Sequence, residues 1–205
     1  MSQVAYLNAG KREQTKQANR QTILDAAREV FGQMGYEQAT VRDIIRRTGL
    51  SIGAFYNYFR SKEEVFEALA DDGARRFAPI LRAEREKAQG FEEFVTGAIR
   101  AYYRFLAEER ENWLDARSPD EPQLHIHGET PEMKAVYNEV RTAILEGIEK
   151  GGFEVDPDYL ATACIGIARD VGDKMLQRRP VDTEGAAAFA TAMILTGLNG
   201  LTHAT

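Results

Sequence analysis

The chain has 205 residues, of which 43% are apolar and 28% charged, so it can bury a core in one large domain or in a small domain joined to a larger one. No apolar run approaches the roughly 20 residues of a membrane span, and the first residues lack the apolar centre of a signal peptide. We therefore expect no membrane association and a cytoplasmic location. The single cysteine, Cys164, excludes an internal disulfide and a Cys-rich metal module, and a small buried residue is the simplest interpretation of it.

The net charge of −6 is unevenly distributed along the chain. Residues 1–62 carry ten Lys and Arg against five acids, a charge of +5, which leaves −11 for the remainder. Such asymmetry suggests a basic end that meets phosphate and an acidic end that does not. An unevenly charged but merely solvated surface is the alternative.

Three helices are expected in the basic part. Apolar residues at helical spacing predict a first helix over residues 17–34, ended by Gly35 in a left-handed conformation. Thr40 can cap a second helix together with Asp43, and Gly49 ends it after about two turns. Ser51 then caps another short helix.

The rest of the chain also reads as helices. Ser61 and Glu64 in the sequence SKEE form a capping box that opens a long helix towards Leu81. Further helices are expected at about 91–110, from Thr130 to the glycines at 151 and 152, at 157–177 and at 183–201. No segment alternates like a strand for long enough to build a sheet, so the predicted fold is all-α.

The aromatic residues after Ser51 are expected to serve two surfaces. On a helical wheel Ile52, Phe55, Tyr56 and Phe59 form one face, and Gly53, Ala54, Asn57 and Tyr58 lie on the other side. Two short helices joined by a tight turn containing Gly are the signature of a helix-turn-helix, whose second helix enters the major groove of DNA. We therefore interpret the first face as core and the second as a DNA-reading face.

The run ILDAAREVFGQMGYEQATVRDIIRRTGLSIGAFYNYFRSKEEVF, residues 23–66, resembles the N-terminal domain of TetR-family transcriptional repressors almost position by position. The resemblance covers about a third of the chain and includes the spacing of "GY..aTv.dIi..tGlS.G.fY.yF.sKeel". It implies a flexible basic arm at 1–16, a helix-turn-helix domain at 17–62 and an effector-binding and dimerisation domain at 63–205. The implied DNA-binding residues are Thr40, Arg42, Ser51, Gly53, Ala54, Tyr56, Asn57, Tyr58 and Lys62. Where some family members carry a polar residue this chain has Ile52, which leaves an apolar contact with a thymine methyl as the expected interaction.

The resemblance also implies an effector pocket among the middle helices and a homodimer. Tyr and Trp can orient a mostly apolar molecule through their polar tips. The candidates for the pocket are Phe77, Phe94, Tyr102, Tyr103, Phe105, Trp113, Met133, Tyr137 and Met175. Small residues in the last two helices allow close approach of a second copy, with Ala163, Gly166, Ile167, Ala188 and Ala192 as candidate contacts.

We thus expect a transcriptional regulator without enzymatic activity or cofactor, most simply a repressor that binds a palindromic operator and is released by a small, largely apolar effector. A helical ligand-binding or scaffold protein without specific DNA binding is the alternative. Residues 49–53 match the G-x-S-x-G motif of serine hydrolases, but that motif requires a strand before the serine, and a helix is expected there. His125 and His127 with Glu129 resemble metal ligands on paper, yet they lie in a long polar connection, and we expect no metal site.

Overall fold

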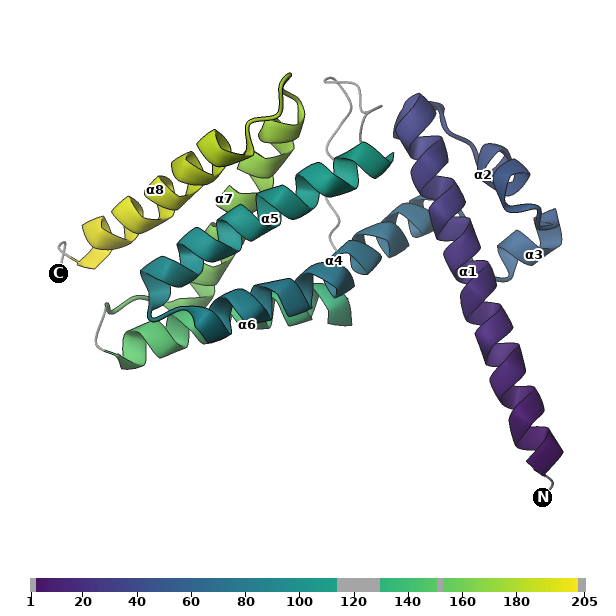
Figure 1. The fold of residues 1–205 in the computed structure, drawn as a ribbon, viewed down its shortest axis with the longest axis horizontal. Helices are drawn as coiled ribbons and strands as arrows, with labels where there is room; N and C mark the ends of the chain where they lie inside the picture. Colours follow the sequence, from purple (N-terminus) through teal and green to yellow (C-terminus); the bar gives the residue numbers. More distant parts are fainter. Residues whose placement is uncertain (1–2, 114–129, 151–152, 203–205) are drawn as a thin grey trace. The chain divides into compact units, whose positions relative to one another are not determined.

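The computed structural model describes residues 3–113, 130–150 and 153–202. All regular secondary structure in these residues is α-helical, which confirms the predicted fold class (Figure 1). The helices are α1 (Gln3–Gln38), α2 (Val41–Thr48), α3 (Ile52–Tyr56), α4 (Lys62–Lys87), α5 (Phe91–Trp113), α6 (Pro131–Glu149), α7 (Pro157–Leu176) and α8 (Thr183–Thr202). No helix in this part of the chain is both long enough and apolar enough to cross a bilayer.

The chain divides into two compact units. The first holds the described residues up to Ala70 together with Asn112 and Trp113, and the second holds residues 71–111 and the described residues from Thr130 onwards. Helix α4 is continuous from Lys62 to Lys87, so its first nine residues belong to the first unit and the rest to the second.

Helix α1 differs from the expected first helix at both ends. It begins at Gln3, so the part of the basic arm that the structure describes is helical, in keeping with the many Lys, Arg, Glu and Gln residues of that segment. At the other end Gly35 has φ 76 and ψ 160. The positive φ is the one that we expected of a glycine, but ψ is extended, and one more helical turn follows the kink before Gln38.

The core of the first unit is formed by α1, α2, α3 and the start of α4. Phe31 and Tyr36 from α1 and Phe66 from α4 form an aromatic cluster, with ring centroids 5.1 to 6.0 Å apart. Ile44 from α2 and Phe55 from α3 are fully buried in the same core. Both short helices are thus held by buried side chains in the core of the first unit.

The second unit is a bundle in which α6 packs against α7 and α7 against α8. Its core joins apolar residues of α4 to α8, among them Phe77, Tyr103, Ile144 and Ile194. This core is separate from that of the first unit.

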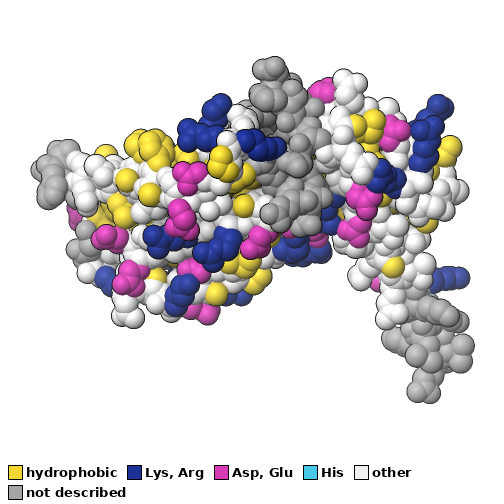
Figure 2. Space-filling view, turned by 45° about the horizontal axis from the view of Figure 1, so that its top comes forward, with side chains coloured by type: hydrophobic (Ala, Val, Ile, Leu, Met, Phe, Trp, Pro, Cys, Tyr) yellow, Lys and Arg dark blue, Asp and Glu magenta, His cyan; other side chains and the backbone are white. Residues whose placement is uncertain are grey.

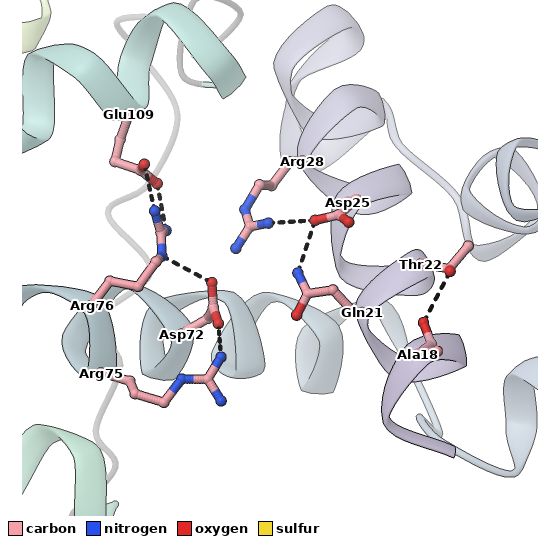
Figure 3. A network of polar contacts seen from close by, with 9 residues as sticks. All are labelled: Ala18, Gln21, Thr22, Asp25, Arg28, Asp72, Arg75, Arg76 and Glu109. Atoms are coloured by element: carbon pink, nitrogen blue, oxygen red, sulfur yellow. Dashed lines mark hydrogen bonds and ion pairs between the residues drawn. The ribbon is translucent and has the colours of Figure 1, made fainter. Parts of the chain in front are cut away.

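Ion pairs tie α4 to its neighbours within the second unit. The Arg76 guanidinium donates two hydrogen bonds of 2.6 Å to the Glu109 carboxylate of α5 and one of 3.1 Å to Asp72 (Figure 3). Arg82 and Arg85 donate to Glu139 of α6 at 2.7 and 3.0 Å. Burial acts to raise the pKa of Glu139, but the two guanidinium groups outweigh it and hold that pKa below its usual range.

Candidate nucleic-acid interface

Helix α2 begins with the predicted capping box. The Thr40 hydroxyl oxygen accepts a hydrogen bond from the Asp43 backbone N–H at 3.3 Å, and the Asp43 carboxylate accepts from the Thr40 N–H at 3.1 Å. The hydrogen bond from the Thr40 side chain is the main cause that holds the pKa of Asp43 below its usual range. Thr40 therefore fixes the start of α2 while its side chain remains exposed.

A tight turn leads from α2 into α3. Gly49 ends α2 with φ 67 and ψ 4, the left-handed conformation that the sequence predicted. The Ser51 hydroxyl accepts from the Ala54 N–H at 3.1 Å and so caps α3. The geometry is that of a helix-turn-helix with α3 in the place of the recognition helix.

The exposed face of α3 differs from the helical-wheel prediction. Phe55 and Phe59 are buried as expected, but Ile52 and Tyr56 are 59% and 53% exposed. The helical wheel placed both on the core face, whereas the family resemblance implied contacts with DNA, which need exposed side chains. The buried side is narrow because α3 has only five residues, so Ile52 has no preceding helical turn to pack against and Tyr56 lies at the edge. The exposed face consists of Ile52, Gly53, Tyr56 and Asn57, with Ala54 and Tyr58 half-buried beside it.

Small size at Gly53 is not required by the protein's own packing. A Cβ atom built on Gly53 would meet nothing within 4 Å, and no positive φ requires glycine there. A glycine that the fold does not need leaves room for another molecule to approach the backbone of α3 closely.

The basic side chains around these helices are unequally available. Arg47 of α2 pairs with Glu29 of α1 at 2.5 Å and also bonds to Gln33, and Arg46 pairs with Asp43. Arg42 and Arg60 are exposed and make no ion pair with any residue whose position is described. These two guanidinium groups are available to a phosphate backbone.

Two other predicted DNA contacts have partners inside the first unit. The Tyr58 hydroxyl accepts a hydrogen bond from the Asn19 side-chain amide at 3.2 Å, which orients the hydroxyl and leaves its proton to donate. The Lys62 ammonium donates to three main-chain carbonyls at the end of α1. The expected phosphate contact of Lys62 therefore competes with bonds that already exist, and it stays a prediction.

The sequence that forms this helix-turn-helix is similar to that of known regulators. Residues 23–69 match the family model described as bacterial regulatory proteins, tetR family. The HTH-type transcriptional repressor AcnR of Corynebacterium efficiens is 33% identical over 146 residues, which cover 67% of this chain and 70% of AcnR. The chain belongs to the TetR family of transcriptional regulators.

Solved structures of transcriptional regulators share the fold over most of the chain. A putative TetR-family regulator from Syntrophomonas wolfei has a TM-score of 0.69 at 22% identity, with 91% of this chain and 97% of that chain covered. The regulator FadR from Bacillus subtilis in complex with stearoyl-CoA has a TM-score of 0.69 at 19% identity, with 86% and 98% covered. At these identities the likeness establishes the TetR fold of both units and nothing about ligands.

Most of the residues predicted for the effector pocket share the core of the second unit but lie in different parts of it. The Phe77 ring lies 5.1 Å from that of Tyr102 and 5.4 Å from that of Phe105, so these three form a cluster between α4 and α5. Phe94 instead contacts Phe91, and the Tyr137 hydroxyl bonds to Asp158 at 3.2 Å. Met175 is buried in the same core and Met133 is half-buried, whereas the side chain of Trp113 lies outside the described residues.

Tyr103 stands apart from the other pocket candidates. Its side chain is fully buried, and its hydroxyl is the one buried side-chain polar atom without a hydrogen-bond partner among the described residues. Burial raises the pKa of the phenol above its usual value, so Tyr103 is a neutral donor. An unpaired buried hydroxyl is unfavourable, so this one calls for a physical explanation.

The predicted dimer contacts are open to solvent in the single chain. Ala163, Ala188 and Ala192 are exposed, and Gly166 and Ile167 are half-buried. The sequence prediction omitted the larger side chains of the same helices: Tyr159, Phe189 and Met193 are 80%, 58% and 52% exposed. Figure 2 shows hydrophobic side chains at the surface in the region where Figure 1 places α8.

The remaining candidates from the sequence have simple placements. Ser51 follows a helix and caps another, which is not the strand-to-helix turn of a hydrolase nucleophile. His125, His127 and Glu129 lie outside the described residues. Cys164 is buried, and burial raises the pKa of its thiol to about 12, so it stays protonated at neutral pH.

Proposed function

We propose that this TetR-family regulator is a repressor that binds a palindromic operator as a homodimer and is released by a small, largely apolar effector. The observation that carries the DNA-binding part is the exposed face of α3. It presents the apolar side chain of Ile52, the unobstructed backbone of Gly53 and the amide of Asn57, while the other side of α3 is buried in the core of the first unit. Such a repressor acts in the cytoplasm. The proposed DNA contacts are Thr40, Arg42, Ser51, Ile52, Gly53, Ala54, Tyr56, Asn57 and Tyr58.

These contacts divide into two kinds. Arg42 and Tyr58 are suited to phosphate oxygens, since one has an available guanidinium and the other a hydroxyl oriented by Asn19. Asn57 can bond to an adenine edge, and Ile52 can contact a thymine methyl. The first kind fixes the position of α3 in the groove and the second selects the sequence.

The homodimer rests on the composition and exposure of α8. After Glu184 this helix carries no charged residue up to Thr202, yet Phe189 and Met193 are more than half exposed. A helix that exposes large apolar side chains without charges between them is stabilised when a partner covers it. A second copy is the partner that a palindromic operator requires, because each half-site receives one recognition helix.

The effector is proposed to bind in the apolar core around Phe77, Tyr102 and Phe105, with the hydroxyl of Tyr103 as its polar anchor. A molecule that carries one hydrogen-bond acceptor would satisfy the unpaired donor and bury its apolar part among the rings. The structure of Bacillus subtilis FadR, which has a similar fold, is of a complex with stearoyl-CoA, a molecule that joins a long apolar acyl chain to a polar CoA group, and this supports the proposal of an effector with an apolar part.

The proposal is tested by selecting duplexes of random sequence on the purified protein. We expect the recovered sequences to share a palindrome with half-sites about one or two DNA turns apart. Recovery of no common sequence, with ligand binding retained, would favour the helical ligand-binding or scaffold protein instead.

A further inference from the structure

The first residue of α4 holds the end of α1. The Lys62 ammonium nitrogen donates to the carbonyl oxygens of Tyr36 at 2.9 Å, Glu37 at 3.3 Å and Ala39 at 3.3 Å. A lysine ammonium has three N–H donors, so these three bonds use its entire donor capacity.

Two of the three carbonyls, those of Tyr36 and Glu37, belong to the last turn of α1, and the third, that of Ala39, follows the helix directly. Gly35 breaks the regular helix with its positive φ, and the last turn of α1 ends at Gln38. Carbonyls at the end of a helix lack intrahelical N–H donors, and a cation placed there also meets the negative end of the helix dipole. Lys62 thus caps the C-terminus of α1 from a different helix.

The first turn of α4 also contacts the side chain of Tyr36, both at its ring and at its hydroxyl. The Lys62 ammonium lies 4.4 Å from the centroid of the Tyr36 ring, and the Tyr36 hydroxyl donates to the Glu63 carboxylate at 3.0 Å. Burial, followed by the bond to Glu63, raises the pKa of this phenol, so it remains a donor. Two consecutive residues of α4 therefore fix one buried tyrosine of α1.

We propose that Lys62 is a positioning residue that joins α4 to the junction of α1 and α2, and that it is not a phosphate contact. The carbonyl of Ala39 immediately precedes Thr40, whose capping box begins α2. Lys62 therefore acts one residue away from the start of the helix-turn-helix. A phosphate could recruit the ammonium only by displacing at least one carbonyl, which would then be left unpaired.

The two roles predict different salt dependence. Each phosphate contact contributes about 0.9 to the slope of the logarithm of DNA affinity against the logarithm of salt concentration. A residue that positions the domain lowers affinity by the same factor at every salt concentration and leaves that slope unchanged.

The test compares Lys62→Met, which keeps the aliphatic stem and removes the donors, with Arg42→Met as the matched control. Both are measured on a duplex selected by the wild-type protein. For Lys62→Met we expect a loss of at least tenfold at every salt concentration with the wild-type slope, and for Arg42→Met a slope reduced by about 0.9.

Two measurements on the free protein complete the test. Lys62→Met is expected to lower the unfolding temperature and to speed amide hydrogen exchange at residues 39–44. Lys62→Arg is expected to show the same direction, because a planar guanidinium does not direct three N–H groups to converging carbonyls, although it would still bind phosphate. The inference rests on contacts within one chain, so the free-protein measurements decide it even if no duplex is recovered and the proposed function fails.

The inference is overturned if Lys62→Met reduces the salt slope as Arg42→Met does. It is equally overturned if the free Lys62→Met and Lys62→Arg proteins unfold and exchange like the wild type.

Discussion

Gly53 lies on the exposed face of α3, where the fold does not require a glycine but the proposed close approach of DNA does. A methyl group there would meet no atom of its own chain within 4 Å. Gly53→Ala should leave the unfolding temperature unchanged or slightly higher, since alanine favours a helix, while DNA affinity falls about tenfold, equivalent to about 1.4 kcal/mol. Gly73→Ala in α4, where a methyl group also meets nothing, is the control, and equal effects of the two substitutions on operator binding would rule out a close DNA approach at Gly53.

Tyr103 gives the second prediction at the residue scale. If its hydroxyl is unpaired until an effector binds, Tyr103→Phe should leave the free protein as stable as the wild type, or more stable by about 1 kcal/mol, because a buried unsatisfied donor is removed. The same variant should lose most of the thermal stabilisation by compounds that stabilise the wild type. A marked fall in the stability of free Tyr103→Phe would instead mean that the hydroxyl already has a partner. Tyr56→Phe, at an exposed position of the first unit, is the control for both measurements.

At the scale of the elements, local chemistry predicted the helices and several of their N-terminal caps, but not the ends of α1. Thr40, Ser51 and Thr130 cap helices as the sequence indicates, because a cap needs only a side-chain oxygen two or three residues from the N–H groups that it accepts. The capping box at Ser61 is only half formed, since the Glu64 carboxylate accepts from the Arg60 N–H. That choice depends on the approach of the preceding chain, which the motif does not specify.

The candidate site was predicted less completely than its helices. The pattern indicated which residues lie near DNA, but the helical wheel assigned Ile52 and Tyr56 to the core because it treats α3 as part of a longer helix. The Lys62 ammonium bonds to residues that lie 23 to 26 positions away in the chain. A spacing rule for residues of one helix cannot predict such a contact.

The exposed face of α8 gives the prediction for this scale. Ala188→Glu places a carboxylate in the proposed interface, where burial of an unpaired charge opposes association. We expect a folded monomer in sedimentation equilibrium, with operator binding reduced at least tenfold because one recognition helix reaches only one half-site. Ala83→Glu on the exposed side of α4 is the control, and a dimer that persists in Ala188→Glu would place the interface elsewhere.

At the scale of the whole molecule, α4 belongs to both units. Its first turn bears Lys62 and Glu63, which bond to α1, and its later turns bear Phe77 and the arginines that pair with α5 and α6. A ligand that shifts the later turns therefore acts on a helix whose first turn is fastened to the helix-turn-helix. Both sets of contacts lie on one helix, since α4 runs from Lys62 to Lys87, with Pro79 inside it.

This continuity leads to a prediction about induction that can be measured in both directions. We expect compounds that stabilise the free protein to weaken operator binding by roughly 5- to 150-fold, a coupling of about 1 to 3 kcal/mol. Because coupling between two binding sites is reciprocal, saturating operator DNA must lower the affinity for the compound by the same factor, which calorimetric titration of the free protein and of the operator complex would measure.

The Lys62→Met variant loses the hydrogen bonds between the first turn of α4 and the end of α1, so the coupling should shrink while the affinity of the free protein for the compound stays that of the wild type. If the compound binds the operator complex and the free protein equally tightly, release by an effector is the wrong mechanism, and a regulator that does not respond to that compound takes its place.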